Sequence, residues 1–74
     1  MMRRGYTLRD ALDNFYDSID SGIIPGTDEI HAMLKNASYD MKDIAELGRE
    51  FGSDERFSEF EKIAESVCIL RAYS

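Results

Sequence analysis

The last third of the chain, from Ser53 to Tyr73, constrains the fold more than any other stretch. No residue from Asp54 to Ala72 breaks a helix, and Ser53 is a residue type that caps one. Wound at 3.6 residues per turn, this stretch separates its apolar from its polar side chains. The apolar face comprises Phe57, Phe60, Ile63, Ala64, Val67, Cys68 and Leu70. Because the stripe extends over about five turns, we expect the rest of the chain to pack on a C-terminal helix.

Three shorter segments before it show the same helical pattern. Thr7 and Asp10 approximate a capping box, and Gly22 is placed to end the first segment. Thr27 is expected to cap the second segment and Asp40 the third. The expected helices cover approximately residues 8–21, 28–36, 41–51 and 54–72. The sequence therefore predicts a single all-α domain over residues 1–74, a compact bundle of four short helices with the C-terminal helix as the longest.

The apolar positions of the three shorter helices predict which side chains face the core. They are Leu8, Ala11, Leu12, Phe15 and Ile19; then Ile30, Met33, Leu34 and Ala37; then Met41, Ile44, Ala45, Leu47, Gly48 and Phe51. Ile23 and Ile24 stand between the first two helices and are expected to anchor the connecting turn.

The charge distribution narrows the class of partner. The net charge is −6, and the six charged residues between Asp10 and Leu34 are all acidic. Residues 28–51 have the length of a helix-turn-helix, but Asp43, Glu46 and Glu50 outnumber Lys42 and Arg49 on the third helix, where a DNA reader would carry basic or amide side chains. We therefore expect no direct binding to nucleic acid and no membrane surface, and we expect any charged partner to be basic.

Four aspartates on the first helix are the most distinctive polar feature. Asp10, Asp13, Asp17 and Asp20 recur every three or four residues, with no basic residue four positions on. One interpretation is a solvated face that aids solubility. The other is a contact surface for a basic partner, extended by Asp28 and Glu29, in which carboxylates mimic the phosphates of a nucleic-acid strand.

No residue pattern predicts catalysis, a cofactor or a metal. The stretch from Asp17 to Asp28 has a superficial likeness to a calcium loop, but Ile19 cannot supply the ligand needed at the third position. His31 is the only histidine and is expected on the surface; Cys68 is the only cysteine and is expected to pack at the core boundary. We expect a protein that is not an enzyme.

Ile69 and Tyr73 lie off the main stripe of the last helix. They could be covered by the N-terminal segment that contains Tyr6, or they could form a homodimer or partner contact. Both alternatives remain open at this point.

These observations lead to two function hypotheses for a protein that, without an apolar leader or a membrane-length run, is expected to be cytoplasmic. The first is a non-enzymatic protein-binding module whose acidic face docks on a basic partner. Its most concrete form is a small inhibitor of a nucleic-acid-handling protein, similar in size and charge to phage inhibitors of restriction or CRISPR complexes. The second is a self-associating helical adaptor or antitoxin-like regulatory subunit.

Overall fold

The computed structural model describes residues 6–73, which form four helices and two very short strands. The helices are α1 (Leu8–Asp20), α2 (Thr27–Lys35), α3 (Met41–Phe51) and α4 (Glu55–Ala72). The strands β1 (Tyr6–Thr7) and β2 (Ala37–Ser38) pair in parallel, with Tyr6 opposite Ala37 and Thr7 opposite Ser38. The all-α bundle with its longest helix last is confirmed, whereas the strand pair was not predicted.

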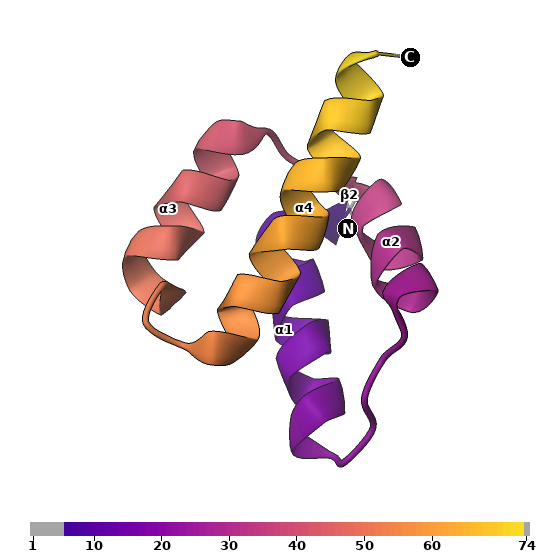
Figure 1. Ribbon diagram of the computed structural model, residues 1–74, viewed down its shortest axis with the longest axis vertical. Helices are drawn as coiled ribbons and strands as arrows, with labels where there is room; N and C mark the ends of the chain where they lie inside the picture. Colours follow the sequence, from indigo (N-terminus) through magenta and orange to yellow (C-terminus); the bar gives the residue numbers. More distant parts are fainter. Residues whose placement is uncertain (1–5, 74) are drawn as a thin grey trace, which may run out of the picture.

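The C-terminal helix α4 is the centre of the packing. It lies across the front of the view in Figure 1, with α3 on one side, α2 on the other and α1 behind, and it contacts all three. Buried side chains from the four helices make one core, to which α4 supplies Phe57, Phe60, Ala64 and Val67. The expectation that the chain packs on α4 therefore agrees with the structure.

Side-chain caps define where the helices begin, although two differ from expectation. Thr7 and Asp10 form the predicted capping box of α1, and Asp40 accepts hydrogen bonds from the Lys42 and Asp43 amides at 3.0 and 3.2 Å. Helix α2, however, begins at Thr27, after Gly26, whose amide donates to the Glu29 carboxylate at 3.0 Å. Asp54, and not Ser53, caps α4, because its carboxylate accepts from the Arg56 amide at 2.9 Å. A carboxylate also suits the positive end of the helix dipole.

The turn after α1 exposes the two isoleucines that were expected to anchor it. Gly22 has a φ of 83°, and the amides of Gly22 and Ile23 donate to the carbonyls of Ile19 and Ser18 at 3.0 and 2.8 Å. This is a Schellman ending, which favours glycine because the left-handed conformation is strained for other residues. It directs the chain away from the core, so Ile23 is 64% and Ile24 is 86% exposed. The prediction for both isoleucines is wrong.

Arg71 fastens the end of α4 to the end of α2, which no sequence pattern indicated. Its Nη2 donates to the carbonyls of Leu34, Lys35 and Ala37 at 2.7, 2.9 and 2.6 Å. The guanidinium also lies 4.9 Å from the centre of the Tyr39 ring, whose hydroxyl donates to the Ala64 carbonyl at 2.7 Å. Because the last carbonyls of a helix have no partner within it, Arg71 supplies the missing donors.

Three residues assigned to the core lie on the surface instead. Met41 and Ala45 of α3 and Leu70 of α4 are exposed. The buried residues of α3 are Ile44 and Leu47, a narrower stripe than its sequence pattern suggests. An edge helix with few neighbours buries only the residues that face them, and periodicity does not reveal how many neighbours it has.

Candidate functional site

The four aspartates of α1 have different environments. One of them takes part in capping α1 and another contacts α4, whereas the remaining two do neither. Asp13 and Asp17 are exposed on the side of α1 opposite its buried residues. The Asp10 carboxylate accepts from the Thr7 amide at 3.0 Å as part of the capping box. Asp20 lies 3.0 Å from Nη1 of Arg56 in α4. The stripe therefore forms a shared face, but its ends take part in the fold.

Two aspartates of the stripe have basic partners, although no basic residue stands four positions after either of them. Arg9, one turn before Asp13, places its Nε 3.9 Å from that carboxylate and its Nη2 3.4 Å from Glu50. The partner of Asp20 comes from a residue 36 positions away in the sequence. No residue within the described range 6–73 forms an ion pair with Asp17. Since Arg9, Asp13 and Glu50 are all more than half exposed, their pairs are weak.

Asp28 and Glu29, the expected extension of the acidic face, lie in the first turn of α2. Both are exposed, but the Glu29 carboxylate also holds the Gly26 amide. They are separated from α1 by the turn that carries Ile23 and Ile24. Asp28 is therefore available to a partner, while Glu29 has a structural role.

Arg56 gathers charged and aromatic groups at the start of α4. It bonds Asp54 through Nε and Nη2, the latter at 2.9 Å, and its guanidinium lies 4.2 Å from the centre of the Tyr16 ring. Hydrogen bonds from the Arg56 side chain and backbone lower the pKa of Asp54 to about 2. Burial and the neighbouring Asp54 carboxylate raise the pKa of Tyr16. These groups stabilise one another and leave Arg56 with little positive charge to offer a ligand.

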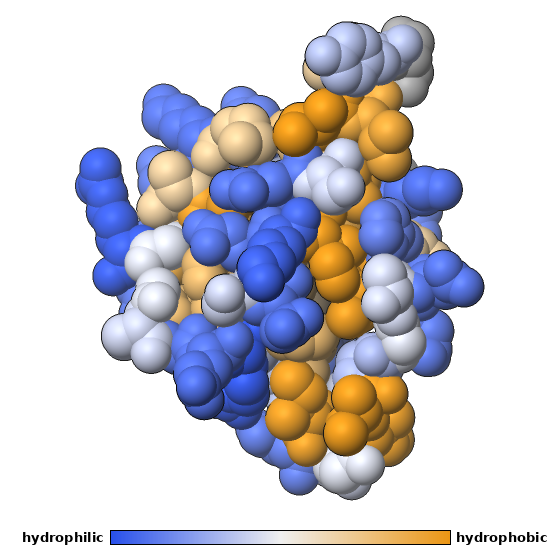
Figure 2. Space-filling view, in the orientation of Figure 1, coloured by the Kyte–Doolittle hydropathy of each residue, from blue (hydrophilic) through white to orange (hydrophobic). Residues whose placement is uncertain are grey.

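An apolar groove lies where α1, α2 and α4 meet. Its apolar lining comprises Phe15, Ile19, Ile24, Pro25, Ile30 and Ile63; its polar lining comprises Thr27, Glu55, Arg56 and Glu59. Its volume is about 420 Å³, within the range common for ligand sites. Figure 2 shows hydrophobic residues gathered along α4 and again at the end of the molecule where Figure 1 places the turn after α1. We call the apolar hollow between α1, α2 and α4 the α2–α4 groove.

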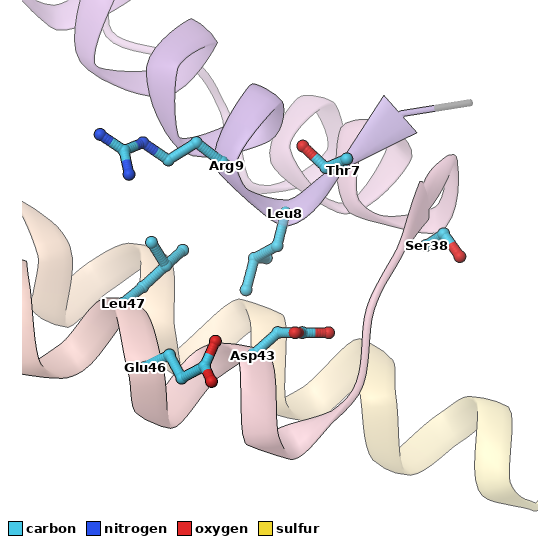
Figure 3. Close-up of a pocket in the computed structure, with 7 residues that line it drawn as sticks. All are labelled: Thr7, Leu8, Arg9, Ser38, Asp43, Glu46 and Leu47. Carbon is cyan, nitrogen blue, oxygen red and sulfur yellow. The ribbon is translucent and has the colours of Figure 1, made fainter. Parts of the chain in front are cut away.

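A second hollow, between α1 and α3, is smaller and more polar. Figure 3 shows Leu8 reaching from α1 toward Asp43 and Glu46 of α3, while Arg9 extends sideways from α1, above Leu47. Its volume is about 280 Å³. Asp43 already holds the Asp40 amide at 2.9 Å, and Leu8 and Leu47 are part of the core. The side chains of this hollow thus support the fold.

Ile69, Leu70 and Tyr73 form an exposed apolar patch near the end of α4, which we call the C-terminal patch. They are 51%, 57% and 85% exposed. Tyr6 does not cover them, because its strand pairs with β2 and its hydroxyl accepts a hydrogen bond from Asn14. A contact of Ile69 and Tyr73 with another molecule stays a prediction. Met1 to Gly5, the rest of the expected N-terminal lead-in, lie outside the described residues.

His31 and Cys68 do not assemble a chemical site. His31 is partly exposed, with Nδ1 3.1 Å from the Thr27 carbonyl. Cys68 is a half-buried free thiol. Across residues 6–73, no three histidine, cysteine or acidic side chains are grouped so that they could hold a metal ion.

Comparison with known proteins adds no function to this geometry. No family model, curated protein or solved structure matches the chain. Within the described residues, none of the helices has the length and apolar character needed to cross a membrane. The features that bear on function are therefore those of the surface: the acidic outward face of α1, the α2–α4 groove and the C-terminal patch.

Proposed function

We propose that this chain is a non-enzymatic protein-binding module whose acidic face docks on a basic partner surface. The observation that carries the proposal is the exposure of Asp13 and Asp17 on the outward side of α1, in a chain with 15 acidic and nine basic residues. Three of the arginines, Arg9, Arg56 and Arg71, have partners inside the protein. Arg9 lies 3.9 Å from Asp13 itself, but both side chains are more than half exposed, so this pair is weak and the Asp13 carboxylate stays accessible to a partner.

The concrete form of this proposal is a small inhibitor of a nucleic-acid-handling protein, of the phage anti-restriction or anti-CRISPR class. A protein that binds nucleic acid presents a basic groove to the phosphate backbone. A row of exposed carboxylates on a rigid helix can occupy such a groove in place of phosphates. The partner would be basic, and the contact would weaken as salt screens it.

The structure indicates which variant tests this proposal without disturbing the fold. Replacing all four stripe aspartates would also remove the Asp10 cap and the Asp20 contact to Arg56. The double variant Asp13→Asn/Asp17→Asn removes two exposed charges and neither of those contacts. A matched control, Glu46→Gln/Glu65→Gln, removes the same charge from α3 and α4.

Affinity capture from host-cell lysate at low and high salt identifies the partner, and titration then measures each variant. We expect a partner retained at low salt and lost at high salt. The α1 double variant should bind several-fold more weakly, about 1 kcal/mol, with a shallower salt dependence, while the control stays close to wild type. Competition by DNA or RNA then tests mimicry. Unchanged affinity and salt dependence in the α1 variant would overturn the proposal.

The C-terminal patch favours a second candidate, self-association as an adaptor or antitoxin-like subunit. Three large apolar residues exposed on adjacent turns are typical of interfaces. Solution mass measured over a range of concentrations tests it. A mass that rises with concentration in the wild type, but not in Leu70→Ser, would support this candidate, and a constant monomer mass would exclude it.

A further inference from the structure

We propose that the α2–α4 groove binds a partner segment in which large apolar side chains are flanked by lysine or arginine. The inference rests on the proposed function in one respect, namely that the partner is basic. It adds a second contact, on a different part of the surface from Asp13 and Asp17, and it names the chemistry of the segment that fills it.

The apolar part of the groove is formed by the fold and then left open. Phe15 and Ile30 are buried beneath it, while Ile19 and Ile63 are half-buried. Ile24 is 86% exposed and lines the same groove, next to exposed Ile23. A scattered surface isoleucine needs no explanation, but Ile24 lines an apolar hollow and extends its binding surface.

The turn after α1 holds Ile24 in this exposed position. The Schellman hydrogen bonds of Gly22 and Ile23 fix the chain as it leaves α1, and Pro25 then restricts the backbone before α2 begins. A segment that binds here meets a side chain already in place. Binding therefore costs less conformational entropy than ordering a flexible loop would.

The charge around the groove selects a cationic segment. Glu55 and Glu59 line it from α4, and the first turn of α2 on the opposite side carries Asp28 and Glu29. Arg56 is the basic residue among the described lining residues, and its guanidinium is bound to Asp54 and Asp20. The positive ends of α2 and α4 contribute only about half a charge each. The carboxylates outweigh them and favour lysine or arginine beside the apolar anchor.

The same charge disfavours the other occupants. A second copy of this chain carries a net charge of −6 and would meet like charge at the rim. An uncharged small molecule would fill the hollow without using the carboxylates. A short segment with apolar anchors and basic flanks satisfies both parts of the surface, as amphipathic segments do when they bind in grooves.

A random peptide display library, selected on the full-length protein, tests the proposal with a defined probe. We expect enriched peptides to share large apolar residues flanked by lysine or arginine. The strongest peptide is then labelled and titrated against variants by fluorescence anisotropy. Ile24→Lys should weaken binding by about tenfold, because it places a charge at a central contact, and Glu59→Lys by a smaller factor.

Matched controls separate the groove from the rest of the surface. Ile69→Lys makes the same change at an exposed isoleucine of the C-terminal patch and should leave peptide affinity unchanged; circular dichroism verifies that each variant is folded. Asp13→Asn/Asp17→Asn should retain peptide binding even where it loses the captured partner, so failure of the α1 proposal is distinguishable from failure of this one. Enrichment of acidic or purely polar peptides, no enrichment, or equal losses in Ile24→Lys and Ile69→Lys would overturn the inference.

Discussion

The two ends of α4 are each fastened by an arginine, but the partners of the two arginines differ in kind. Arg56, at the start of the helix, bonds the carboxylates of Asp54 and Asp20. Arg71, at the end, bonds three backbone carbonyls between Leu34 and Ala37. Both guanidinium groups lie over a tyrosine ring, at 4.2 Å for Arg56 and 4.9 Å for Arg71. The aromatic contact is thus similar, and the hydrogen-bond acceptors are what differ.

This difference decides how much each arginine stabilises the fold. An exposed carboxylate that loses its arginine is solvated by water, so a surface ion pair contributes little. A helix-terminal carbonyl in a part-buried position has fewer alternatives, and leaving it without a donor costs its desolvation. The contacts of Arg71 should therefore stabilise the fold more than those of Arg56, which lies beside the α2–α4 groove.

The largest effect is expected from Arg71→Met. The variant leaves the carbonyls of Leu34, Lys35 and Ala37 without their charged donor, so we expect the free energy of unfolding to fall by about 2 kcal/mol. Urea denaturation followed by circular dichroism measures the loss. Arg71→Lys keeps the positive charge but not the planar set of guanidinium donors, so its free energy of unfolding should lie between those of wild type and Arg71→Met. A loss below about 0.5 kcal/mol would place Arg71 among ordinary surface contacts.

A smaller effect at the same end of α4 is expected from Tyr39→Phe. Loss of the hydrogen bond to the Ala64 carbonyl should lower the free energy of unfolding by about 1 kcal/mol. Burial raises the pKa of Tyr39 from 10.0 to about 12, so the folded protein keeps a proton that the unfolded chain releases in this range. The resulting stability is present below pH 10 and is lost as the pH rises from 10 through 12.

Comparing wild type with Tyr39→Phe between pH 9 and 12 isolates this contribution from that of the other tyrosines. The difference in stability between the two proteins should shrink across the alkaline range. A constant difference would mean that the Tyr39 hydroxyl titrates alike in the folded and unfolded states.

The smallest effect is expected at the Arg56 end, from Asp54→Asn at acid pH. Hydrogen bonds from Arg56 lower the pKa of Asp54 from 3.8 to about 2, so the folded protein resists protonation of this carboxylate. The stability it contributes is present above pH 3.8 and is lost as the pH falls from 3.8 through 2. Asp54→Asn should remove part of the acid dependence of the urea midpoint. An acid dependence identical to wild type would contradict the role of Arg56.

The elements that could be predicted from sequence are those whose signals are local. Two capping boxes, Thr7 with Asp10 and Asp40 with Asp43, supply side-chain acceptors to backbone amides three residues away. The structure confirms both. Ser53 and Asp54 are adjacent residues that can each cap a helix, so the choice between them depends on where Arg56 and the first turn settle. The expected helix boundaries agree with those of the structure to within one residue.

The candidate surfaces were predictable only in part. The spacing of the four aspartates places them on one side of α1, but the contacts of Asp20 with Arg56 and of Glu50 with Arg9 join residues 36 and 41 positions apart. The α2–α4 groove combines side chains of three helices and one turn, and Ile24 was expected only to anchor that turn. No pattern within one segment indicates a groove between segments.

By itself, the sequence of this protein determined its helical class, the central role of its last helix and its acidic character. Helix period, caps and net charge depend on residues close in the chain or on composition alone, so they do not require the fold. Only the tertiary structure decided that Arg71 donates to the carbonyls at the end of α2, that Asp20 pairs with Arg56 and that Ile24 faces solvent. Each of these depends on which helix ends meet in space, and that is settled by the packing of the whole core around α4.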